Sequence, residues 1–334
     1  MNEIRALERA VGCFFSIKRR LLFTKYTYFW LLEHILYGTR FSQFFELKRK
    51  LVHKSIIKGI SKRDFSPFQV PEISIDNTRQ IKKHILQGTP FVIRGGAKSV
   101  PLYKEWGFDF FEKNYGEKEQ TVFLDANYST GGKEMKLRDI IQGLRSGTKN
   151  INLLFGNLIF TNEKLKLAMG PFFLKSWSIY KYSMLKIDHL FMSGKDTFTF
   201  AHSEFGDNLF LQVRGRKTWK IFKPSLAPLF FPLVRRRIFL QSGEGCDDLS
   251  KNTEILKAPH YSVVLEEGDL LFNPCLHWHY VETHEDSISI SSRWSSVWNF
   301  AKHPFVFFLF VTATNPSIFY QLFNKGETSP KNLS

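Results

Sequence analysis

The sequence has little cysteine and no long apolar run. Cys13, Cys246 and Cys275 are its three cysteines in 334 residues, and their wide spacing excludes a disulfide framework and suits a reducing compartment. No uninterrupted stretch reaches the roughly 18 apolar residues that a membrane span needs. The N-terminus also lacks the pattern of a signal peptide. We therefore expect a cytoplasmic protein.

Acidic residues are outnumbered as well, with 31 Asp and Glu against 47 Lys and Arg and a net charge of +16. Such a charge attracts nucleic acid, anionic lipid headgroups or acidic substrates, and does not choose among them. The sequence contains no helix-turn-helix, zinc-finger or RNA-binding aromatic motif, which disfavours nucleic acid. A hydrophobic content of 43% and an aromatic content of 16% indicate a folded protein with a large core.

The chain divides into three zones. Residues 1–66 are basic and aromatic and look helical, residues 67–298 alternate strands and turns, and residues 299–334 are apolar and then polar, with an end expected to fray. The first zone predicts either a helical cap on the domain or an amphipathic contact with a membrane surface, which would make the protein peripheral to it. The apolar run 305–311 is compatible with a homodimer contact, a core helix or a membrane wedge.

A candidate metal site begins with the pair His202 and Glu204. In a strand predicted over 197–204 these residues are two apart and therefore share one face. A third, neutral histidine would complete a two-His-one-carboxylate triad, which leaves three positions open on Fe(II). His277 and His279 both qualify, and strand parity alone does not choose between them. Without that third ligand, the pair is weak evidence for a metal site and is more typical of an exposed polar strand.

Lys217 is a candidate anion-binding residue. It begins a strand predicted over 217–222 and shares a face with Trp219 and Ile221. A lysine on an apolar face is costly unless its ammonium is paired, so a bound anion is one explanation. The other is that the ammonium reaches water beside the adjacent turn.

Several segments, in order, resemble the cupin-like, JmjC-related 2-oxoglutarate oxygenases. They are 90–95 with Trp106, 201–209, 212–217, 222–224, 267–274 and 278–281, and the resemblance spans about 88–296. It implies a mainly β fold with helical additions, namely a double-stranded β-helix, or jelly roll, flanked by N- and C-terminal helices. It also implies Fe(II) and 2-oxoglutarate as cofactors, with 2-oxoglutarate and dioxygen as cosubstrates.

Position by position, the resemblance assigns the metal to His202, Glu204 and His279. His279 is preferred to His277 because the family's ligand follows an aromatic residue. Glu204 departs from the aspartate of many relatives, but glutamate is also a ligand in JmjC demethylases.

The cosubstrate contacts are assigned in the same way. Lys217 and Thr199 match residues that bind the distal carboxylate of 2-oxoglutarate, and Asn208 matches a residue beside its metal-binding end. An asparagine that many relatives carry on the last strand is replaced around Ser291–Ser292 and Arg293. Arg293 is therefore expected either to bind an anion there or to face solvent.

The function implied is hydroxylation of an unactivated C–H bond of a protein or peptide side chain. A small molecule or a membrane glycolipid headgroup is the alternative substrate. A non-catalytic cupin-like binding module would need a broken triad or a broken cosubstrate site, and the sequence shows neither.

Overall fold

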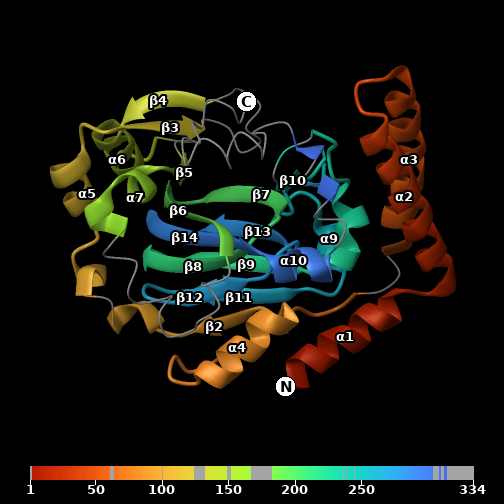
Figure 1. The fold of residues 1–334 in the computed structure, drawn as a ribbon, viewed down its shortest axis with the longest axis horizontal. Coiled ribbons are helices and arrows are strands. Elements are labelled where there is room, and N and C mark those ends of the chain that lie inside the picture. The colour runs from red at the N-terminus through yellow and green to blue at the C-terminus, as the bar shows by residue number, and fades with distance from the viewer. Residues whose placement is uncertain are drawn as a thin grey trace.

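Two facing β-sheets form the centre of the protein in a computed structural model, and helices cover them on several sides (Figure 1). The structure describes residues 2–60, 64–99, 101–123, 132–148, 152–166, 183–235, 237, 239–243, 245–303, 308, 309, 312 and 313. Both sheets are mostly antiparallel, with a short parallel pair at one edge of the first sheet.

The first sheet has six strands in the order β1-β11-β9-β13-β7-β10. Their bounds are β1 Phe68–Gln69, β7 Thr197–Glu204, β9 Lys217–Phe222, β10 Phe239–Gln241, β11 Tyr261–Leu265 and β13 Trp278–Thr283. The strands predicted at 197–204 and 217–222 are confirmed as β7 and β9.

The second sheet has eight strands in the order β2-β12-β8-β14-β6-β5-β3-β4. Their bounds are β2 Phe91–Ile93, β3 Glu119–Phe123, β4 Gly132–Lys136, β5 Asn152–Gly156, β6 Ser183–Ser193, β8 Asp207–Arg214, β12 Leu270–Asn273 and β14 Ser287–Ser296. The consecutive strands β7, β8 and β9 alternate between the sheets, and so do β11 to β14. This winding is the predicted double-stranded β-helix.

Alternation along β8 shows what lies on each side of the second sheet. Leu209 and Leu211 contribute to an outer core with helices α4 (Thr78–Gln87), α5 (Phe108–Tyr115), α6 (Leu137–Arg145) and α7 (Leu158–Thr161). Phe210 points the other way and packs with Trp219 of the facing sheet. The space between the sheets is therefore lined by alternate residues of both, and these include the candidate site residues.

Three helices occupy the first sixty residues: α1 Asn2–Phe14, α2 Ile17–Ile35 and α3 Arg40–Ile60. The helices α2 and α3 stand side by side at one end of the molecule, away from α5 and α6 (Figure 1). Both contact the 3₁₀ segment η4 (Pro224–Phe230). Short helices α9 (Thr253–Leu256) and α10 (Val297–Lys302) and 3₁₀ turns η1 (Gly96–Ser99) and η2 (Pro101–Lys104) complete the described elements.

A buried ion pair attaches α2 and α3 to the β-sheet domain. The guanidinium of Arg49 donates to Glu33 at 2.7 Å and to the backbone oxygen of Pro232 at 2.6 Å, and it lies over the ring of Phe231. Because Arg49 is 1% exposed, these contacts hold its charge without water. The predicted helical cap is therefore present.

The predicted apolar run 305–311 lies mostly outside the described residues. Phe308 and Leu309 are described, and they pack on the core beneath α2 and α3. In the part of the chain that the structure describes, no helix has both the length and the hydropathy required to cross a membrane.

Candidate metal centre and cosubstrate cavity

Two neighbouring strands bring three potential metal ligands together. His202 and Glu204 share the inner face of β7, and His279 of β13 lies directly opposite His202 in the antiparallel register. One ligand atom from each side chain lies within 4.8 Å of the others, and all three residues are buried. Among the described residues this is the only such group of histidine, cysteine or acidic side chains.

Each imidazole is held in an orientation that suits metal binding. The Nδ1 atom of His202 lies 2.8 Å from the backbone oxygen of Phe200, and that of His279 lies 3.2 Å from the oxygen of His277. The carbonyl oxygen of Phe200 can only accept, so Nδ1 of His202 carries the proton and its lone pair is on Nε2, available to a cation. Nδ1 of His279 also lies 3.1 Å from the side-chain amide nitrogen of Asn273, so it is engaged on two sides and Nε2 is the nitrogen left for a cation. Burial also lowers the pKa of His279 to about 3, which keeps this ring neutral.

The carboxylate of Glu204 is fixed by Arg293. Its two oxygens accept from Nε of Arg293 at 2.8 Å and from Nη2 at 2.7 Å, which is the paired geometry of a strong charge-assisted contact. Burial opposes ionisation of Glu204, but Arg293 and His202 outweigh it and hold its pKa well below the usual range. Arg293 therefore does not simply face solvent. Its assignment to the cosubstrate stays a prediction.

His277 lies outside the triad for a local reason. The strand β13 begins at Trp278, and Leu276 has a positive φ of 61°, so His277 belongs to the turn before the strand. Strand parity does not extend to it, and its Nδ1 lies 3.3 Å from the backbone oxygen of Cys275. The structure thus brings His279, and not His277, to the candidate metal position.

Lys217 lies on the same inner face as His279, four positions away along the paired strands β9 and β13. It pairs with Thr283 of β13, whereas Ile221 pairs with His279. Lys217 is 2% exposed, and its Nζ atom contacts the hydroxyl of Ser193 at 3.3 Å. No carboxylate of the described residues forms an ion pair with it, and burial lowers its pKa to about 7. The interior therefore contains an amine that a bound anion would hold in its charged form.

A β-bulge places Thr199 on that face too. Between the pairs His279–His202 and Val281–Thr199, β13 has one residue and β7 has two. The extra residue reverses the alternation, so Thr199 lies on the same side as His202 although they are three apart. A regular strand would have turned the Thr199 hydroxyl away from the site.

Unsatisfied polar atoms lie on the same inner faces. The Nδ2 atom of Asn208 is buried and has no hydrogen-bond partner among the described residues, while its Oδ1 accepts from Ser291 at 2.8 Å. The indole nitrogen of Trp219 is likewise buried without a partner, and its ring stacks on His279 with 5.0 Å between centroids. Buried donors without acceptors in the protein indicate that a bound ligand supplies the acceptors. The hydroxyl of Ser291 orients the amide of Asn208 through its hydrogen bond.

The residues present therefore fit the cofactors that the resemblance implies. Two neutral imidazoles and one carboxylate on one face are the ligand set of non-haem Fe(II) oxygenases. A buried ammonium without a counter-ion and a free amide donor suit a dicarboxylate such as 2-oxoglutarate.

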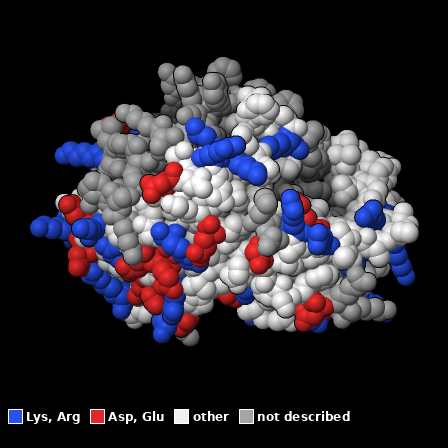
Figure 2. Space-filling view, turned by 90° about the horizontal axis from the view of Figure 1, so that it is seen from below, with Lys and Arg blue, Asp and Glu red and all other residues white. Residues whose placement is uncertain are grey.

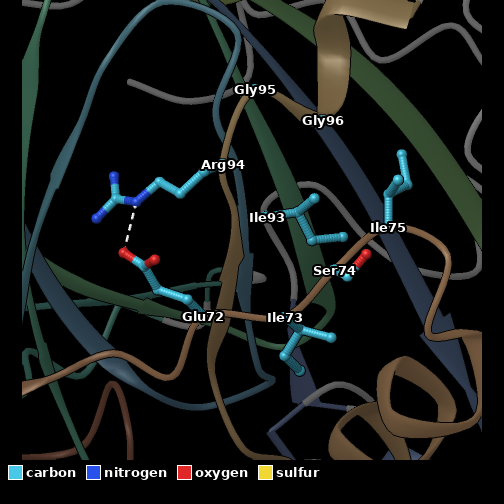
Figure 3. A pocket seen from close by; sticks show the side chains of 8 residues that line it. All are labelled: Glu72, Ile73, Ser74, Ile75, Ile93, Arg94, Gly95 and Gly96. Atoms are coloured by element: carbon cyan, nitrogen blue, oxygen red, sulfur yellow. Dashed lines mark hydrogen bonds and ion pairs between the residues drawn. The ribbon is translucent and has the colours of Figure 1, made fainter.

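A cavity of about 630 Å³ lies away from the triad, where β2 meets the chain before α4. It is lined by residues 72–75 and 93–96. Figure 3 shows Arg94 and Glu72 turned to one side and isoleucines to the other. Arg94 pairs with Glu72 and with Asp269, each at 2.7 Å, so its charge is already neutralised. We assign no chemistry to this cavity.

A family model for the cupin-like domain matches residues 77–299. The chain belongs to the cupin-like domain family. This protein is also similar to lysine-specific demethylase 8 of Danio rerio, with 32% identity over 245 residues that cover 68% of this chain and 58% of the relative. Lysine-specific demethylase JMJ30 of Arabidopsis thaliana is 25% identical over 232 residues, covering 65% of this chain and 52% of the relative.

Human HSPB1-associated protein 1 is 34% identical over 93 residues, which cover 26% of this chain and 19% of that protein. The chain thus spans between 19% and 58% of the length of these curated relatives. The family match and these relatives together confirm the prediction from the sequence motifs that this chain belongs to the cupin-like and JmjC-related group.

Proposed function

We propose that this cupin-like protein is an Fe(II)- and 2-oxoglutarate-dependent dioxygenase that hydroxylates an unactivated C–H bond of a protein or peptide side chain. The observation that carries the proposal is the buried group of His202, Glu204 and His279 on the face that also carries Lys217. The names of two relatives, both lysine-specific demethylases, support a protein substrate.

Each side chain has a distinct role in this proposal. Nε2 of His202, Nε2 of His279 and one oxygen of Glu204 would hold the iron. Lys217 and Thr199 would bind the distal carboxylate of 2-oxoglutarate, and the amide of Asn208 would donate a hydrogen bond near its other end. When bound, iron and 2-oxoglutarate supply the activation of dioxygen and the oxidising power for the C–H bond.

The surrounding residues prepare the ligands for this task. Arg293 keeps Glu204 ionised and restricts its rotation. The carbonyl of Phe200 keeps the imidazole proton of His202 on Nδ1, and the carbonyl of His277 and the amide of Asn273 hold the ring of His279 at its Nδ1. The ring of Trp219 covers one face of His279 and excludes water from it. The triad is complete in the described residues, which argues against a non-catalytic binding module.

Anaerobic titration with Fe(II) and then 2-oxoglutarate tests the metal and cosubstrate assignments. The expected result is a visible metal-to-ligand charge-transfer band that saturates at one equivalent of iron. Glu204→Ala and His279→Ala should lose the band, because two ligands hold the metal weakly. His277→Ala is the matched control and should keep it. A band that survives in His279→Ala and disappears in His277→Ala would overturn the triad.

Succinate release then tests the substrate class. We expect peptides to stimulate succinate formation by the iron-loaded protein, and mass spectrometry to find a gain of one oxygen atom in the peptide. Stimulation by small molecules or glycolipid headgroups, with no response to peptides, would replace the substrate class and leave the metal assignment intact.

A further inference from the structure

Helices α2 and α3 form a pair, and one side of this pair packs against the domain. Their inner side packs on the core that includes η4, and it is made of Phe23, Tyr26, Trp30, Val52, Ile56 and Ile60. The network around Arg49 fixes the pair to the backbone at Pro232. Because both helices bury the sides that face the domain, their opposite sides together form one outer face.

That outer face is apolar along both helices. On α2 the exposed fraction is 83% for Ile17, 66% for Leu21 and 58% for Tyr28, and on α3 the exposed apolar side chains include Phe44, Leu47 and Leu51. The separations of four and seven residues on α2, and of three and four on α3, put each set on one stripe of its helix. Two adjacent apolar stripes of this size mark an interaction surface.

The charged residues beside the stripes are almost all basic. The two helices carry eight exposed lysine and arginine side chains. Their two acidic residues are Glu33, which is buried with Arg49, and Glu46, which pairs with Lys50 at 2.7 Å. On the face shown in Figure 2, most acidic side chains gather on the left, whereas α2 and α3 lie on the right in Figure 1.

We propose that the outer face of α2 and α3 binds an anionic lipid surface, with both helices lying in the plane of the headgroups. Apolar stripes flanked by lysine are the pattern of interfacial helices, whose apolar side enters the boundary between headgroups and acyl chains. Anionic headgroups supply the opposite charge that the face lacks.

Two other occupants fit the face less well. A second copy of this chain would bring two sets of like charges together, which opposes association. A protein partner would have to bury several lysines, which are depleted in protein interfaces. Lipid headgroups, in contrast, accept lysine ammonium groups at the water boundary while the apolar side chains enter below them.

Vesicle flotation of the full chain tests the proposal. The probes are vesicles of phosphatidylcholine alone and vesicles with about one third phosphatidylserine. We expect binding to the anionic vesicles, at least ten-fold weaker binding to the neutral ones, and release as salt is raised. Each lysine near the surface contributes about five-fold in affinity. We therefore expect at least a hundred-fold loss of affinity for anionic vesicles in the quadruple variant Lys18→Gln, Lys25→Gln, Lys54→Gln, Lys58→Gln.

A second variant tests the apolar stripes, and a matched control tests position. The triple variant Leu21→Ser, Leu47→Ser, Leu51→Ser should also lose at least a hundred-fold in affinity for anionic vesicles. Leu86→Ser with Lys83→Gln changes an exposed leucine and an exposed lysine on α4 and should bind like the parent chain. All these residues are exposed, and thermal melting confirms that each variant is folded. Absence of vesicle binding by the parent chain overturns the proposal, as does equal binding of neutral and anionic vesicles. A concentration-dependent dimer that the leucine variant abolishes assigns the face to a second copy instead.

Discussion

Replacing Lys217 with methionine should stabilise the ligand-free protein while removing its response to 2-oxoglutarate. The ordinary pKa of lysine is 10.5, and burial without a counter-ion lowers that of Lys217 to about 7. Each pKa unit corresponds to about 1.36 kcal/mol, so the full difference corresponds to about 5 kcal/mol. Methionine has a similar length and no charge, and we expect it to recover about 2–4 kcal/mol of folding free energy.

The pH dependence has a definite sign. The penalty from Lys217 is complete below its folded-state pKa, because the ammonium is then charged in both the folded and the unfolded chain. It disappears as pH rises past the unfolded value, where both are neutral. The ligand-free parent protein should therefore gain stability between about pH 7 and pH 10.5 relative to Lys217→Met.

Anaerobic thermal melting with Fe(II), with and without 2-oxoglutarate, measures both effects. At a hundred times its Kd, 2-oxoglutarate should stabilise the parent protein by about 2.7 kcal/mol. Lys217→Met should melt higher without 2-oxoglutarate and gain nothing from it. Lys220→Met is the control, because Lys220 lies on the same strand and pairs with Glu282 at 2.7 Å. A lower melting temperature for ligand-free Lys217→Met, or an undiminished response to 2-oxoglutarate, would refute the reasoning.

Two further substitutions remove arginines that pair with buried carboxylates. Arg293→Met removes both hydrogen bonds to Glu204 and should weaken Fe(II) binding about ten-fold or more, as measured by competition titration. Arg216 is exposed, and Arg216→Met should leave Fe(II) binding unchanged. Equal Fe(II) affinities of the two variants would contradict the positioning role of Arg293. Arg49→Met leaves Glu33 buried without its partner and should lower the free energy of unfolding by about 3–5 kcal/mol in a denaturant titration. A stability equal to that of the parent would show that water reaches Glu33.

Sequence patterns were most informative where local rules decide the structure. The strands that carry His202 and Lys217 were predicted with their observed bounds, because alternation and flanking turns mark them. The family motifs then predicted the winding of the two sheets.

The remaining features depend on contacts between distant segments. The bulge that turns Thr199 inward arises from the pairing of β7 with β13, and no local signal marks it. The pairing of Arg293 with Glu204 joins strands of different sheets, so alternation could place Arg293 on the inner face but could not name its partner. The choice of His279 over His277 rested on family resemblance alone, since parity treated them alike. The turn at Leu276 supplies the physical reason.

The direct opposition of His202 and His279 has a consequence for when iron can bind. These residues come from strands that are distant along the chain, and the strands meet only in the finished first sheet. A slip of one residue in that pairing would turn His279 to the opposite side. A nascent or partly folded chain therefore presents isolated histidines rather than a chelating site. Iron binding would therefore require that β7 and β13 have paired in the correct register. Misfolded copies would lack the chelating site and would be less exposed to metal-catalysed oxidation.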